Sequence, residues 1–318
     1  MNRMSSKHVI LLVLAALILV APWFFPSSYY FRVVSLVFVN GIAVLGMVIL
    51  TGYVGQISLG HAAFIGIGAY ACALAPGHLG IPVVLAAVLG ACISGLLAWL
   101  VGRPILKLKG YYLSVATLGF GVLVSMVLTN EAWLTGGPDG IAVPDAGLRG
   151  LLRDLGFKVG NPELWYAING VMLLIGAWIA LNLRNSATGR ALRALHGSEV
   201  AARTVGVDVA AFKLRGFVIS AVYASVSGSL LAMQNRFVTP DVASFMHSIE
   251  IVTMAVLGGV GSVPGAVFGA AILTALPQML TFFHEYEQIM LGLIMMLVMI
   301  FMRDGLLPGL VRIFRGRS

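Results

Sequence analysis

Apolar segments of about 20 residues recur along this chain, separated by short polar stretches. A helix of that length crosses the roughly 30 Å hydrocarbon core of a bilayer. The first seven segments lie at residues 9–25, 31–50, 55–75, 81–101, 112–129, 164–183 and 214–233. In lipid, only helices and closed barrels satisfy their own backbone hydrogen bonds, and the sequence lacks the alternating ten-residue strands of a barrel. We therefore expect an all-α polytopic membrane protein.

The composition agrees with this fold class. Only 10% of the 318 residues are charged, whereas soluble proteins carry about 25%. We therefore interpret residues 1–318 as a single transmembrane domain. The net charge of +8 would suit a nucleic-acid partner. Because most of the basic residues lie in loops on one side, we expect a lipid bilayer and no nucleic acid.

The number of crossings depends on the last third of the chain. Residues 249–280 are too long for one span and are interrupted by GGVGSVPG at 258–265. We interpret them as a short span or re-entrant half-helix followed by a second helix. A last span is expected at 288–302, and the first run, 9–25, lacks a convincing cleavage site and is kept as a span. This gives about 10 transmembrane helices, or eight and a re-entrant pair, with both termini on one side.

The distribution of charge predicts which side that is. Fifteen of the 20 Lys and Arg residues lie in the N-terminus, at 103–109, at 184–215 and in the C-terminal tail. Only three of the 12 acidic residues lie in the same segments. Cytoplasmic segments of membrane proteins are enriched in Lys and Arg. We therefore expect cytoplasmic N- and C-termini, and an external loop at 130–162.

Residues 184–215, which we call the hub, form the longest strongly basic interruption between spans. Ser198 is a good helix N-cap, and Glu199 follows in the first turn, where the helix dipole favours an anion. Gly206 can end that helix in a left-handed conformation. Asp208 is placed to cap the helix that re-enters the membrane. The hub is therefore expected to be two or three short docked helices.

The hub resembles the coupling loop of permease subunits of ABC importers, and more narrowly of branched-chain amino acid (LIV-type) permeases. The resemblance rests on GRALRAL at 189–195 and SEVAARTVGVDV at 198–209. Val200 is inserted between the acid and the alanines, and His196 stands where the family usually has arginine. The resemblance implies that the hub docks on an ATPase and transmits its closure. The implied coupling residues are Arg190, Arg193, Ser198, Glu199, Ala201, Ala202 and Gly206.

A glycine-rich segment at 52–70 carries three polar residues in an apolar stretch, namely Gln56, Ser58 and His61. Polar groups at membrane depth are expensive and are commonly functional. His61 either fixes helix packing or lines a solute path, and the sequence leaves both open. Residues 55–70, GQISLGHAAFIGIGAY, match a signature of the LIV-type family over their whole length.

Two further motifs carry the same resemblance. Residues 108–121, LKGYYLSVATLGFG, are similar to one of the two permease types of these transporters, and TGGPDGI at 135–141 is similar to their external turn. On backbone grounds TGGPDGI is a tight turn. The basic residues Arg103, Lys107 and Lys109 either anchor a helix at lipid headgroups or contact the ATPase.

The segments 52–66 and 258–269 share a weak internal similarity. Glycine-interrupted segments in two halves of a transporter often form its path, although small residues also recur simply at helix contacts. With the family resemblance, the candidate pathway residues are Gln56, Ser58, Gly60, His61, Phe64, Thr117, Gly119, Gly137, Gly258, Gly259 and Gly261.

The sequence has no phosphate-binding G-x4-G-K-[ST] motif, no metal-ligand spacing and no persuasive catalytic pair. We expect no enzyme activity, no cofactor in this chain, and ATP bound by partner subunits. We interpret Glu250 as a residue that stabilises the start of a helix, and we prefer this interpretation to a proton-coupling role. The alternative function is a self-sufficient secondary carrier or channel, and an intramembrane enzyme has less support.

The resemblance implies the partners and the membrane. The partners are a second permease, two ATPases and a soluble substrate-binding protein, and the membrane is the inner membrane of a bacterium. The solute stays open among branched-chain amino acids, urea, amides and other small molecules.

Overall fold

The computed structural model describes residues 3–108, 110–147, 150 and 160–279, and the isolated positions 292, 296 and 305. Almost all of the expected last span at 288–302 lies outside the described residues. So do the C-terminal tail, Lys109, and residues 148–149 and 151–159 of the external loop.

Long helices dominate the described part, and it contains seven that are long and apolar enough to cross a membrane. Two shorter apolar helices follow, α12 (Phe245–Gly258) and α13 (Val263–Met279). The long helices are α1 (Arg3–Val20), α2 (Ser28–Val48, continued by the π-helical turn η2, Ile49–Val54), α3 (His61–Leu79), α4 (Val83–Ile105), α5 (Tyr111–Asn130), α8 (Asn161–Asn185) and α11 (Val209–Asn235). The all-α, multi-pass prediction is confirmed.

The division of residues 249–280 into a short helix and a second helix is also confirmed, because α12 ends at Gly258 and α13 begins at Val263. The expected start of the third span is wrong. Gly55 adopts a left-handed conformation (φ 76°) that ends η2, and the chain then continues without helix until His61. The hub bounds shrink as well, since α8 runs to Asn185 and α11 begins at Val209.

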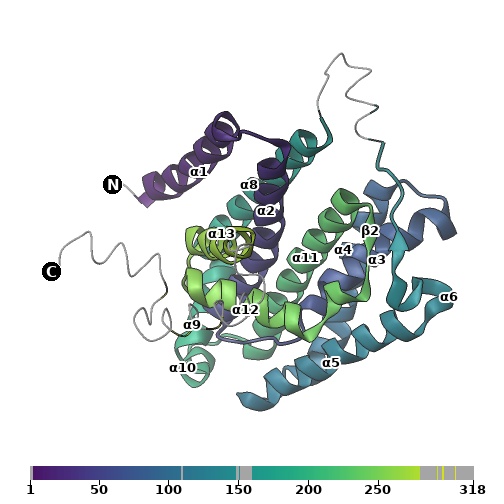
Figure 1. The fold of residues 1–318 in the computed structure, drawn as a ribbon. Coiled ribbons are helices and arrows are strands. Elements are labelled where there is room, and N and C mark those ends of the chain that lie inside the picture. The colour runs from purple at the N-terminus through teal and green to yellow at the C-terminus, as the bar shows by residue number, and fades with distance from the viewer. Residues whose placement is uncertain are drawn as a thin grey trace.

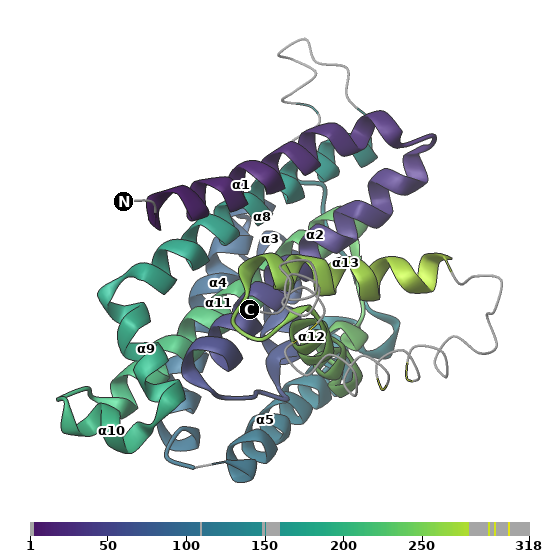
Figure 2. The same ribbon diagram turned by 90° about the vertical axis from the view of Figure 1, so that its left-hand side faces the viewer.

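Helices α2, α3 and α11 form the centre of the bundle, and α1 lies on its outside against α8 (Figures 1 and 2). Small residues allow the central helices to approach closely. A Cβ atom at Gly68 of α3 would overlap the backbone of Ser225 in α11, and one at Gly228 of α11 would overlap the backbone of Ile65. The core of this protein therefore depends on backbone-to-backbone contacts as much as on large side chains.

The two ends of the bundle differ. One end carries the hub helices, α9 (Ala187–Gly197) and α10 (Glu199–Thr204). The opposite end carries several short elements, and Figure 1 places α6 and β2 far from α10. These elements are η1 (Ala21–Phe24), α6 (Ala132–Thr135), η3 (Gly137–Asp139), β1 (Ile141–Ala142), β2 (Phe237–Val238) and η4 (Pro240–Ala243).

Strands β1 and β2 lie at that opposite end. They pair antiparallel, with Ile141 opposite Val238 and Ala142 opposite Phe237. An ion pair between Arg236 and Asp145 lies beside them. The pairing joins the segment after α5 to the segment after α11, so it holds residues 141–142 against the bundle.

Candidate functional site

The hub consists of two short helices whose starts are capped by side chains. Ser186 Oγ accepts a hydrogen bond from the Gly189 amide at 3.1 Å, which caps α9. Ser198 Oγ accepts from the Ala201 amide at 3.3 Å, which caps α10. Asp208 Oδ1 accepts from the Ala211 amide at 3.1 Å, which caps α11. The predicted caps at Ser198 and Asp208 are confirmed.

The predicted end of α10 is also confirmed. The helix ends at Thr204, and Gly206 follows with a φ of 83° in the left-handed region. A left-handed glycine after the last helical residue reverses the chain without steric cost. Because it is capped at both ends, α10 is a defined helix rather than an irregular loop.

Replacing Ser198 with alanine is expected to loosen α10 by about 1 kcal/mol, because the cap hydrogen bond to the Ala201 amide is lost. Hydrogen exchange of the amides of residues 200–205 should become about fivefold faster, while exchange in α11 stays unchanged. Ser198→Asp keeps an acceptor at the cap and should retain the slow exchange. Equal exchange rates in Ser198→Ala and the parent protein would contradict the role of the cap.

The hub is docked on the bundle through apolar side chains. Leu192, Leu195 and Ala202 are buried. A Cβ at Gly216 of α11 would lie 2.5 Å from Val54 Cγ2 and 3.7 Å from Leu192 Cδ2, so α11, the end of η2 and α9 meet at one point. The His196 ring lies against Gly55, just beyond η2. Helix α9 therefore packs directly against the end of the α2–η2 segment.

An ion pair joins the second hub helix to α11. Lys213 Nζ lies 2.5 Å from Glu199 Oε1, and the lysine side chain is only 6% exposed. Both residues line a cavity of about 600 Å³ together with Arg103, Lys107 and Arg203. The basic turn after α4 and the hub therefore lie at the same end of the bundle. Lys213 is missing from the sequence-predicted set, because a partner 14 positions away follows no helical spacing.

The outer surface of the hub is part basic and part apolar. The Arg190 and Arg193 guanidinium groups donate to the backbone oxygens of Asn185 and Arg184, at the end of α8. Ala201 is exposed, and Val200 and Val205 are each 75% exposed. Exposed apolar side chains grouped on a small knob are typical of a protein contact. The family resemblance marks Val200 only as an insertion, so it does not predict the exposure of this side chain.

The candidates from the glycine-rich segment gather where α3 begins. His61 is 1% exposed, its Nε2 donates to the Ala43 backbone oxygen at 3.3 Å, and its Nδ1 lies 3.5 Å from Ser220 Oγ. Thr117 Oγ1 of α5 accepts from the Leu59 amide at 3.1 Å. Phe64 packs against Phe120 and Phe217. With its nitrogens engaged by α2 and α11, His61 fits the packing alternative better than exposure to a solute.

The remaining pathway candidates lie in several places. Gln56 and Ser58 are buried in the segment between η2 and α3, and the described residues offer the side-chain nitrogen and oxygen of Gln56 no hydrogen-bond partner. Gly119 lies on the open side of α5, where a Cβ would meet no atom within 4 Å. Gly137 lies at the end opposite the hub, beside Ala132.

Gly258, Gly259 and Gly261 form the turn between α12 and α13. A Cβ at Gly52 of η2 would overlap the backbone of Gly261. The two segments that share the weak internal similarity therefore touch each other. Since η2 also contacts α9, this crossing lies close to the hub.

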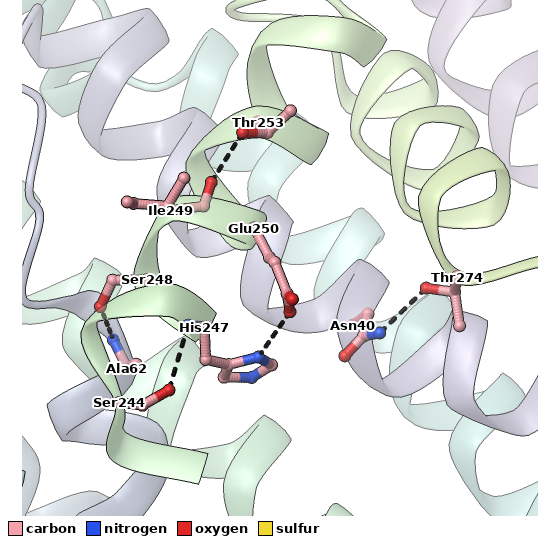
Figure 3. Close-up of polar contacts among 9 residues, drawn as sticks. All are labelled: Asn40, Ala62, Ser244, His247, Ser248, Ile249, Glu250, Thr253 and Thr274. Carbon is pink, nitrogen blue, oxygen red and sulfur yellow. Dashed lines mark hydrogen bonds and ion pairs between the residues drawn. The ribbon is translucent and has the colours of Figure 1, made fainter. Parts of the chain in front are cut away.

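Glu250 does not begin α12, so its interpretation as a helix-start residue is wrong. Ser244 is the N-cap and accepts from the His247 amide at 3.2 Å, whereas Glu250 lies in the second turn. Its carboxylate is 3.2 Å from His247 Nδ1 (Figure 3). Two residues before Glu250, Ser248 Oγ accepts from the Ala62 amide at 3.0 Å, which joins the start of α12 to the start of α3.

A family model described as branched-chain amino acid transport system / permease component matches residues 29–299. Among curated proteins, the chain is similar to the high-affinity branched-chain amino acid transport system permease protein LivM of Salmonella typhimurium and of Escherichia coli K12. Each is 31% identical over 317 residues, which cover 94% of this chain and 75% of the relative. A second relative of the same transport system, LivH of Escherichia coli K12, is 28% identical over 83% of this chain and 89% of its own length. No solved structure matches.

Proposed function

This chain belongs to the family of branched-chain amino acid transport permease components, and on that premise we propose how it works as the membrane permease subunit of an ABC importer. The observation that carries the proposal is the docking of the hub. Two capped helices are fixed by Leu192 and by the Glu199–Lys213 ion pair to the end of η2 and to α11. A rigid knob attached in this way to two central helices can transmit a force from another protein.

The proposed mechanism follows from these contacts. Closure of the ATPase pair pushes on α10, where the exposed Val200 and, just after the helix, Val205 offer an apolar contact surface. The push passes through α9 to η2, which crosses the α12–α13 turn at Gly52 and Gly261. Because α12 and α13 move with that crossing, the path for the cargo switches from outward to inward access. ATP is bound by the partners in this scheme, and this chain supplies no residue to the nucleotide.

The proposed partners are a second permease, two ATPases and a soluble substrate-binding protein. Support for the second permease comes from the similarity to two different permease proteins of one transport system in Escherichia coli K12. We place the hub and the N-terminus in the cytoplasm of a bacterium, with the chain in the inner membrane. The cavity that gathers Arg103, Lys107, Arg203 and Lys213 at the hub end supports this orientation, because cytoplasmic ends are rich in basic residues.

The test is uptake of radiolabelled leucine into proteoliposomes that hold the complete transporter with its binding protein outside. ATP enclosed with the ATPases should drive uphill uptake, and a collapse of the proton and sodium gradients should leave it unchanged. Uptake that persists without ATP and disappears with the ion gradient would overturn the proposal in favour of a secondary carrier.

A further inference from the structure

Glu250 lies deep within the membrane part of the bundle. Helix α12 has 14 residues and is therefore about 21 Å long, shorter than the roughly 30 Å core that a span must cross. Its last residue adjoins the Gly52–Gly261 crossing near the hub. Glu250 comes eight residues before Gly258, so it lies about 12 Å along α12 from that end.

The contacts of α12 place Glu250 relative to the long α2–η2 segment. Ser248 receives its hydrogen bond from Ala62, and the adjacent His61 binds the backbone oxygen of Ala43. Ala43 lies near the middle of the long α2–η2 segment, which spans 28–54. Glu250 is thus at the level of the middle of α2, where lipid chains would surround any side chain on the outside of the transporter.

The Glu250 side chain is nevertheless 54% exposed on the isolated chain, and His247 beside it is 20% exposed. Within the described residues, His247 is its one ion-pair partner, and it engages Oε2. A carboxylate at membrane depth is costly and almost always faces a water-filled cavity or another protein group. The exposed side of α12 is therefore a surface of the translocation path or of a subunit contact.

The side chains around Glu250 suit an amphipathic ligand. Met246 lies one turn earlier on the same face of α12 and is 63% exposed. Methionine adapts its shape to varied apolar groups. Figure 3 also shows a polar contact between α2 and α13, in which Asn40 Nδ2 donates to Thr274 Oγ1 at 2.9 Å. The exposed face of α12 thus offers one carboxylate next to an adaptable apolar side chain.

We propose that Glu250 binds the α-ammonium group of a zwitterionic amino acid as it passes along the path, with Met246 against the branched side chain. This inference rests on the proposed function and deepens it, because it assigns a cargo-recognising residue. An ammonium group adds the attraction of opposite charges to its hydrogen bond with a carboxylate, whereas neutral urea and amides supply only uncharged N–H donors. The permease itself then contributes to the choice of amino acids, in addition to the binding protein.

The experiment uses the complete transporter in proteoliposomes with leucine-loaded binding protein at saturation. Glu250→Gln keeps the size and removes the charge, and we expect leucine uptake to fall at least tenfold. Stimulation of the ATPase by the binding protein should stay within twofold of the parent, because the hub is untouched. Glu250→Asp should restore part of the uptake, and Asp139→Asn, a charge removal at the far end of the bundle, should have no effect.

Each other outcome decides against the inference. If Glu250→Gln transports leucine at the parental rate, the ammonium contact is wrong although the importer function stands. If the complex of Glu250→Gln separates into subunits on size exclusion, Glu250 pairs with a cation of the second permease instead. If the parent transporter shows no ATP-driven uptake, the proposed function fails, and the assignment of cargo to Glu250 fails with it.

Discussion

Replacing Glu199 with lysine should abolish leucine uptake while the transporter still inserts, assembles and hydrolyses ATP. The Lys213 ammonium is nearly buried, and its described partner is the Glu199 carboxylate at 2.5 Å. The substitution removes a hydrogen bond to a charged group and brings two cations together, at a cost of about 2 kcal/mol or more. That cost shifts the docking of α10 on α11 by roughly 30-fold, so ATPase closure no longer moves the path.

The readouts are ATP hydrolysis and leucine uptake, measured on the same proteoliposomes. The matched control is the double variant Glu199→Lys with Lys213→Glu, which reverses the ion pair and should recover much of the uptake. Lys213→Met alone should give an intermediate loss of uptake. This variant loses the ion pair with Glu199, but it leaves no unpaired buried cation. Full uptake by Glu199→Lys would show that α10 is not the coupling element.

A methyl group at Gly60 should have the second large effect. A Cβ there would overlap the backbone oxygen of Thr117 and would lie 3.2 Å from the Gly121 amide nitrogen, so α3 and α5 would have to separate. Overpacking of this kind costs about 1–3 kcal/mol, toward the upper value where the neighbour is backbone. Gly60→Ala should lower the thermal unfolding temperature of the purified complex and reduce uptake severalfold.

Gly119→Ala is the matched control, since it adds the same methyl group to α5 at a position with no atom within 4 Å. It should unfold at the parental temperature. The prediction is contradicted if Gly60→Ala and Gly119→Ala have the same unfolding temperature and the same uptake as the parent.

Local chemistry accounts for the parts of the site that the sequence predicts correctly. Helix capping depends on residues within three or four positions of each other, so the starts at Ser198 and Asp208 and the turn at Gly206 can be predicted from neighbours alone. The break at 258–262 follows from the same rule, because glycines there favour conformations that end a helix. The start of the third span is mispredicted because Ile57 and Leu59 extend the hydropathic segment, although α3 begins only at His61.

Contacts between distant segments account for the rest. The partner of Glu199 is Lys213 on another helix, and the partner of Ala62 is Ser248, which is 186 positions away. Hydropathy does not show whether Glu250 lies at the start of α12 or inside it. The structure places the N-cap at Ser244, and this position sets the start of α12. Such pairs depend on how the helices cross. The crossing depends in turn on close backbone contacts at many glycines together.

The sequence by itself determined the membrane-spanning helices, the capped hub and the family. The length of the apolar segments, the distribution of charge and the helix caps all depend on residues that are close together in the chain. Only the tertiary structure decided that the Glu199–Lys213 ion pair holds the hub against α11, that the two glycine-rich segments touch at Gly52 and Gly261, and that the Glu250 side chain is 54% exposed. The physical reason is that burial and partnership depend on which helices pack together, and a single sequence does not state which surfaces meet.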